Sequence, residues 1–234
     1  MPSRNSLKIY ADGSYYHIYN RGVEKRIIFT DSQDYNVFLN YVAEYLLPKD
    51  EDKLKDQLSN PDLTYRDKDK IIRLLRMNNF YKEITLIAFC LMPNHFHLLI
   101  KQKTAGLIDK FMNSLGTRYT MYFNKKHKRV GPLYQDVYKA VMIKSDEQLL
   151  HLTSYIHRNP ILKRLLQEDV LRVCLSQPSS LSEYLGNSQF SWVHPEEILA
   201  YFSKTNPYLS YEVFVKQEEN FLLIQDKAID FLAL

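Results

Sequence analysis

The sequence contains no apolar run long enough to cross a membrane. A spanning helix needs about 20 mostly apolar residues, and no window approaches this length, although 45% of the 234 residues are hydrophobic. Residues 1–6 also lack the apolar core of a secretory signal peptide. We expect a protein without membrane segments, built as one domain with an extension or as two small domains.

Cysteine is scarce. The two cysteines, Cys90 and Cys174, stand in apolar surroundings and do not have the close spacing of metal-binding pairs. Disulfides are rare in cytosolic proteins. We therefore expect two reduced, structural thiols in a cytosolic protein.

The net charge is only +4, but its distribution is uneven. Residues 101–164 hold 13 Lys and Arg against 4 Asp and Glu, whereas residues 165–234 hold 4 against 10. A solvated helix face explains most charge runs. Here the 18 tyrosines of the chain, several of them among the basic residues, favour a nucleic acid as the partner of the middle region.

Two histidines follow Pro93 at the start of an apolar stretch, His95 and His97. Proline rarely sits inside a central strand, so a strand begins after it. Alternate side chains of a strand share a face, which places both imidazoles on one side, where they can converge on one metal ion. The alternative is a pair of half-exposed histidines. Further His or Asp ligands, which the common metal hydrolases have, are missing because Leu98 and Leu99 follow.

The remaining periodicities predict strands at 14–20, 83–91 and 133–143, and helices from Asp31 to Pro48, at 105–124 and at 145–158. With the histidine strand, this order is a ferredoxin-like βαββαβ plan plus one added helix. We predict an α+β fold with an antiparallel sheet, helices on one face and the histidines on the open face. Residues 48–82 read as a charged helical insertion, and 167–234 as a mostly helical extension of a domain at 1–166.

The added helix carries His151, Tyr155 and Asn159 at four-residue intervals, so they share one face. A tyrosine one turn from an amide suits a nucleophile beside a ligand of a hard cation. Residue types alone leave Tyr134 and Tyr138 as rivals. His17, on the first strand among tyrosines, is more often a packing or phosphate-contacting residue than a ligand.

The two motifs together resemble a known family. His95-Phe96-His97 followed by residues 155–160, Tyr-Ile-His-Arg-Asn-Pro, is similar to the IS200-like single-tyrosine transposases of the HUH superfamily. More narrowly, the chain resembles their REP-associated tyrosine transposase branch. Supporting stretches are residues 16–22, 91–99, 119–124, 131–135 and 179–186.

The resemblance implies that His95, His97 and Asn159 hold Mg²⁺ or Mn²⁺ and that Tyr155 is the catalytic nucleophile. Such enzymes cut and rejoin single-stranded DNA that carries hairpins, through a 5′-phosphotyrosine link and without ATP. His151 and His17 are candidates to support the ligands. The expected DNA contacts are basic: Arg21, Arg118, Lys125, Lys126, Lys128, Arg129 and Arg158.

The same resemblance implies a bacterial, cytoplasmic and nucleoid-associated protein, and favours a monomer over a homodimer. The alternative is a weak or inactive enzyme that binds DNA or RNA hairpins on the same fold.

Overall fold

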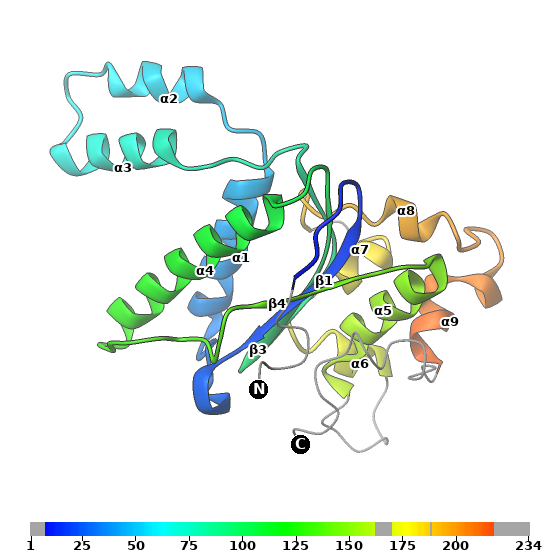
Figure 1. The fold of residues 1–234 in the computed structure, drawn as a ribbon. Coiled ribbons are helices and arrows are strands. Elements are labelled where there is room, and N and C mark those ends of the chain that lie inside the picture. Colours follow the sequence, from blue (N-terminus) through cyan, green and yellow to red (C-terminus); the bar gives the residue numbers. More distant parts are fainter. Residues whose placement is uncertain (1–7, 162–169, 188, 218–234) are drawn as a thin grey trace.

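The sheet has four antiparallel strands. The computed structural model describes residues 8–161, 170–187 and 189–217. Within them, the strands β1 (Tyr15–Arg21), β2 (Ile84–Met92), β3 (His95–Gln102) and β4 (Lys139–Met142) lie in the order β2-β3-β1-β4 (Figure 1). This order is that of the predicted ferredoxin-like plan, with the histidine strand β3 inside the sheet.

Helices cover both faces of this sheet. Helices α1 (Ser32–Leu46) and α4 (Leu107–Lys126) pack together on one face, and α5 (Asp146–Arg158) lies against β2 and β3 on the other (Figure 1). The prediction of an open histidine face is therefore wrong. Its apolar residues, such as Leu99 and Ile87, are fully buried in a second core with α5. When both faces of a strand are apolar, each face needs its own layer of packing to be removed from water.

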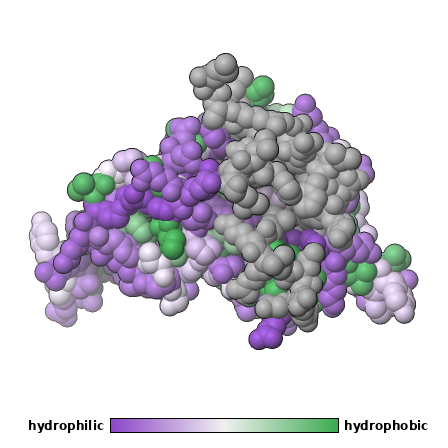
Figure 2. All heavy atoms as spheres, turned by 90° about the horizontal axis from the view of Figure 1, so that it is seen from below, coloured by the Kyte–Doolittle hydropathy of each residue, from purple (hydrophilic) through white to green (hydrophobic). Residues whose placement is uncertain are grey.

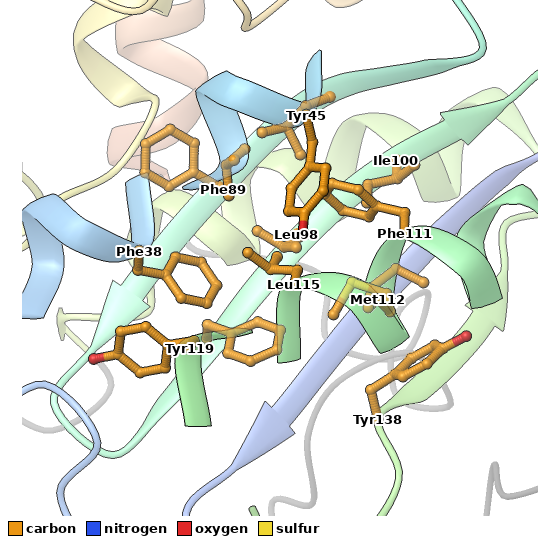
Figure 3. Packing of buried hydrophobic residues seen from close by; sticks show 14 of the residues in the cluster. Phe38, Tyr45, Phe89, Leu98, Ile100, Phe111, Met112, Leu115, Tyr119 and Tyr138 are labelled. Atoms are coloured by element: carbon orange, nitrogen blue, oxygen red, sulfur yellow. The ribbon is translucent and has the colours of Figure 1, made fainter. Parts of the chain in front are cut away.

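The first core lies between the sheet and helices α1 and α4. Phe96, Leu98 and Ile100 alternate along β3 and are buried in this core. Figure 3 shows Leu98 and Ile100 with Phe38 of α1 and Phe111 of α4. The ring centroids of Phe38 and Phe96 are 5.5 Å apart. Aromatic pairs at this separation add to the burial of apolar area, so this core anchors one face of β3.

The predicted helix starts are confirmed by their caps. Asp31 accepts a hydrogen bond from the backbone N–H of Asp34 at the start of α1, and Ser145 accepts one from Gln148 at the start of α5. The predicted strand at 133–143 is shorter, because only residues 139–142 pair with β1. The preceding stretch carries Gln135 and Asp136 and forms bends, so the strand begins later than predicted.

The predicted insertion forms an arm. Helices α2 (Glu51–Leu58) and α3 (Tyr65–Arg76) pack on each other and project away from the sheet (Figure 1).

A 3-10 turn, η1 (Val23–Lys25), follows β1. The face seen in Figure 2 is mostly hydrophilic outside its grey part. No helix in the described ranges has the length and apolarity of a membrane span.

The C-terminal region lies along the β2 edge of the sheet. It contains α6 (Val170–Cys174), α7 (Leu181–Tyr184), α8 (Glu196–Leu199), η3 (Pro207–Leu209) and α9 (Tyr211–Lys216). The segment before α7 pairs with β2: Leu91 N–H donates to the Pro178 carbonyl at 2.9 Å, and Ser180 N–H to that of Phe89 at 3.0 Å. An unpaired edge strand can form hydrogen bonds with strands of other chains and so promote aggregation. The predicted domain boundary at residue 166 lies outside the described residues.

A buried carboxylate joins α1 to the end of α4. Asp34 is fully buried and accepts hydrogen bonds from Lys126 at 2.7 Å, from Tyr122 at 3.0 Å and from Thr30 at 2.6 Å. Burial raises its pKa, but these bonds outweigh it and lower the pKa from 3.8 to about 2. The network therefore stabilises the fold only while Asp34 is ionised.

We expect Asp34→Asn to lower the free energy of unfolding by about 2 kcal/mol at neutral pH, since the buried side chain loses the charge that strengthens its hydrogen bonds from Lys126, Tyr122 and Thr30. Because the pKa of Asp34 is lower in the folded protein, its contribution is complete above pH 4 and is lost as the pH falls towards 2. Denaturant unfolding at several pH values measures both effects. Asp136→Asn, at a carboxylate 58% exposed, is the control and should change little; an equal loss in both variants would contradict the role of the network.

Candidate active site

The turn Pro93–Asn94 fixes where β3 begins. The Pro93 carbonyl accepts hydrogen bonds from the backbone N–H groups of Ile28 and Phe29, at 2.8 and 3.0 Å. The Asn94 carbonyl accepts one from Gly22 at 2.9 Å. The segment after β1 thus holds the hairpin turn in place, and with it the first histidine of β3.

Gly22 allows this close approach. A Cβ atom at this position would lie 2.2 Å from the Arg26 carbonyl oxygen and 2.8 Å from a methyl group of Ile28. Both distances are too short for any side chain, so the backbone can fold back on the turn only at a glycine.

Three predicted ligands meet beneath α5. Nε2 of His95 lies 3.0 Å from Oδ1 of Asn159, and Nε2 of His97 lies 3.0 Å from Nδ2 of the same amide. Their exposed fractions are 8%, 0% and 4% for His95, His97 and Asn159. Asn159 ends α5 as its C-cap, so the sheet and the helix each contribute donors to one buried point.

The donor set fits a hard divalent cation. Ligands at about 2.1 Å in adjacent octahedral positions lie about 3 Å apart, which is the spacing between Asn159 Oδ1 and His95 Nε2. The amide faces His97 with Nδ2, which donates to the ring and is not itself a ligand. The ring nitrogens facing away are engaged as well: Nδ1 of His95 lies 2.7 Å from Asn94 Oδ1, and Nδ1 of His97 lies 2.8 Å from His17 Nε2. Metal-binding histidines usually have such outer partners.

One contact in this cluster calls for a positive charge. Asn94 Nδ2 donates to the Lys25 carbonyl at 3.2 Å, which leaves Asn94 Oδ1 to accept the Nδ1 proton of His95. A neutral His95 then turns the lone pair of Nε2 towards Asn159 Oδ1, so two acceptors face each other. A metal ion bound by both atoms removes this repulsion.

His97 remains neutral in this setting. Burial, reinforced by the nearby His17 and His95, lowers the pKa of His97 well below 6.5. In residues 8–161, 170–187 and 189–217, no three or more His, Cys, Asp or Glu side chains form a metal-binding group. The cluster described here contains two imidazoles and an amide.

Tyr155 lies beside the histidines. The centroid of its ring is 5.5 Å from that of His97, with the planes at 89°, and 6.2 Å from that of His17. The side chain is 3% exposed. The rival tyrosines lie elsewhere: Tyr138 bonds to Tyr10 and Asp109, and Tyr134 packs against Phe96 on the opposite face of β3.

The other two histidine candidates have different surroundings. His17, fully buried on β1, stacks on His97 with ring centroids 5.1 Å apart. His151 lies in the middle of α5 and packs against Phe214 of α9, at 5.5 Å between centroids. The structure therefore brings His17, and not His151, into contact with a predicted ligand.

His157 is a structural residue that the sequence reasoning did not single out. Its Nδ1 lies 2.7 Å from the Tyr211 hydroxyl and its Nε2 lies 2.8 Å from Ser180 Oγ. Burial lowers its pKa to about 3. A neutral His157 thus ties α5 to the C-terminal region. The sequence places it beside Arg158 and Asn159 but carries no signal for its distant partners.

The predicted DNA-contacting residues fall into two groups. Some are held by partners within the protein: Arg118 pairs with Glu44 at 2.6 Å, Lys126 with Asp31 and Asp34 at 2.7 Å, and Arg158 donates to the Val215 carbonyl at 2.8 Å. Arg21 donates to Gln135 and Arg129 to Asn124. Lys125 and Lys128, at the end of α4 and just after it, are exposed.

These observations define an α+β protein with a histidine pair, an amide and a tyrosine gathered in one buried site. Residues 59–159 match the family model described as "Transposase IS200 like". The match spans less than half of the chain and includes His95, His97, Tyr155 and Asn159. It confirms the predicted resemblance: residues 59–159 are similar to the IS200-like transposases.

Two solved structures are similar in part. One is described as a REP-associated tyrosine transposase bound to a REP hairpin; it is 13% identical, with a TM-score of 0.47 over 89% of this chain and 97% of that chain. The other is a predicted transposase of Deinococcus radiodurans R1, 17% identical, with a TM-score of 0.26 over 67% of this chain and 95% of that one. Among curated proteins, no sequence matches.

We expect His157→Phe to lower the free energy of unfolding by about 1–3 kcal/mol, because two buried hydroxyl groups lose a partner. For a chain of this size, this corresponds to a fall of several degrees in the melting temperature. Differential scanning calorimetry checks it against His194→Phe, at a histidine 50% exposed. Unchanged melting in His157→Phe would show that these bonds do not hold the C-terminal region.

Proposed function

We propose that this protein is a metal-dependent endonuclease and strand transferase for single-stranded DNA, in the manner of the REP-associated tyrosine transposases. The observation that carries the proposal is the meeting of His95, His97 and Asn159 beside the ring of Tyr155. His95 and His97 come from a strand, and the other two come from a helix about sixty residues further along the chain.

His95, His97 and Asn159 would hold Mg²⁺ or Mn²⁺. When bound, the cation polarises the scissile phosphate and stabilises the charge that develops on it. Nδ1 of each ring is engaged by Asn94 or His17, so the rings are held for this task. The buried surroundings strengthen each electrostatic contact in the site.

Tyr155 would be the nucleophile. Its phenolic oxygen, after loss of its proton, attacks phosphorus, and the bond from phosphorus to the 3′ oxygen breaks. The 3′ oxygen takes up a proton, and the products are a 5′-phosphotyrosine and a free 3′-OH. A second 3′-OH reverses the reaction on the same bond and joins the strands without ATP. Because Tyr155 is 3% exposed, we expect DNA binding to open the space beside it.

The DNA would be a single strand that carries a hairpin. Lys125 and Lys128 are the leading candidates for phosphate contacts because both are exposed. Arg21 and Arg129 can add to them, since their partners Gln135 and Asn124 are neutral. Arg118, Lys126 and Arg158 already have charged or backbone partners inside the protein. The enzyme would work in the bacterial cytoplasm on nucleoid DNA, as a monomer.

Incubation with hairpin oligonucleotides from the flanking genomic DNA, with Mn²⁺, should give a covalent protein–DNA adduct on a denaturing gel. We expect Tyr155→Phe to abolish the adduct while hairpin binding persists. The matched control is Tyr134→Phe, since the buried Tyr134 hydroxyl has no hydrogen-bond partner in the described part of the chain. An undiminished adduct with Tyr155→Phe would mean that another residue is the nucleophile.

Salt dependence separates the two groups of basic residues. We expect Lys125→Ala and Lys128→Ala each to weaken hairpin binding and to reduce the slope of log K against log salt by about 0.7, the value for one phosphate contact with a single strand. Arg118→Ala should leave the slope unchanged and lower the melting temperature, because it breaks the Glu44 pair. Fluorescence anisotropy at several salt concentrations measures the slopes; equal slopes in all three variants would refute this division.

A further inference from the structure

Asn94 and His17 each engage the outer ring nitrogen of one proposed ligand. Asn94 Oδ1 lies 2.7 Å from Nδ1 of His95, and His17 Nε2 lies 2.8 Å from Nδ1 of His97. We propose that Asn94 and His17 are positioning residues that keep both rings in the tautomer protonated on Nδ1, so that both Nε2 lone pairs face one divalent cation. The inference rests on the metal site of the proposed function.

The orientation of Asn94 is fixed from outside the site. Its Nδ2 donates to the Lys25 carbonyl at 3.2 Å, and a carbonyl oxygen can only accept. The amide therefore turns Oδ1, which is also only an acceptor, towards His95. Nδ1 of His95 has to carry the proton of that hydrogen bond. When the ring is neutral, Nε2 therefore carries no proton and presents its lone pair.

An uncommon turn places the Lys25 carbonyl. Glu24 and Lys25 have φ angles of 55° and 60°, the left-handed region that non-glycine residues seldom occupy. Lys25 N–H donates to the Gly22 carbonyl at 3.0 Å, and Arg26 N–H donates to that of Val23 at 3.0 Å, which closes the turn. Strained backbone of this kind persists where its surroundings hold it, and here it faces Asn94 and, through it, His95.

His17 acts on the second ring in the same way. His97 Nε2 accepts a hydrogen bond from Asn159 Nδ2 at 3.0 Å, so a neutral His97 carries its proton on Nδ1. That proton is donated to His17 Nε2. The two rings are nearly parallel, at 14°, and both are fully buried. Thus β1 provides an acceptor for the Nδ1 proton of His97, as the hairpin turn provides one for the Nδ1 proton of His95.

Removal of Asn94 would allow His95 to change its tautomer. Without Asn94, His95 can move its proton to Nε2 and donate to Asn159 Oδ1, which is 3.0 Å away. In that tautomer the ring presents N–H where a cation needs a lone pair. Loss of such outer partners typically weakens metal binding by about 10–100-fold.

Isothermal titration of the full-length protein with Mn²⁺ tests this directly. We expect Asn94→Ala and His17→Phe each to raise the Kd for Mn²⁺ by about 10–100-fold. Asn94→Asp keeps an oxygen for the Nδ1 proton and should bind within about threefold of wild type or more tightly. The control Asp34→Asn lies in the separate α1–α4 network, and should lower stability without changing the Kd for Mn²⁺.

The ¹⁵N shifts of the histidine rings in the metal-free protein supply a readout that lost stability does not move. Wild type should show the proton on Nδ1 of His95 and His97, and Asn94→Ala should show it on Nε2 of His95. Equal Mn²⁺ affinity in wild type, Asn94→Ala and His17→Phe overturns the inference, as does a wild type that binds no Mn²⁺. If Mn²⁺ binding follows the expected pattern but no DNA adduct forms, the cleavage proposal fails and this inference stands.

Discussion

The burial of both faces of β3 is the constraint on which the rest depends. On one face Phe96, Leu98 and Ile100 join the core with α1 and α4. On the other, Leu99 requires a cover of its own, and α5 supplies it. The same cover encloses His95 and His97, because alternate side chains of a strand share a face and both histidines lie on the face of Leu99. A helix that packs there brings its own polar residues, Tyr155 and Asn159, against the two imidazoles. The packing of α5 on the sheet therefore both completes the second core and assembles the site.

The fold follows from the sequence because its signals are local. Alternation predicts β3, caps at Asp31 and Ser145 predict two helix starts, and the order of elements predicts the sheet. The prediction that the histidine face of the sheet is open is wrong, because α5 covers it. The apolar run of β2 is nearly all buried, and such a run indicates a strand with both faces covered. That signal could have corrected the prediction.

The site could be predicted only in part. Spacing and resemblance place His95, His97, Tyr155 and Asn159, and the structure brings them together. The contacts of His17 with His97, and of Asn94 with the Lys25 carbonyl, depend on strand register and on one turn with left-handed residues. No periodicity encodes either. The ion pairs of Lys126 likewise depend on a carboxylate 92 residues away, so a basic run alone cannot tell phosphate contacts from structural charges.

The C-terminal region holds α5 near both of its ends. Tyr201 donates to Asp146 at the start of the helix at 2.8 Å, and His157 near its end bonds to Tyr211. The position of Tyr155 therefore depends on a region without proposed ligands of its own. Bracing of α5 accounts for an extension whose acidic composition does not suit DNA.

The most direct measurement is the electron spin echo modulation of the protein loaded with Mn²⁺. We predict couplings from two directly bound imidazole nitrogens, with one lost in His95→Ala and one in His97→Ala. Bound Mn²⁺ without any imidazole coupling would contradict this prediction, because the cation would then lie away from the two histidines around which the site is built.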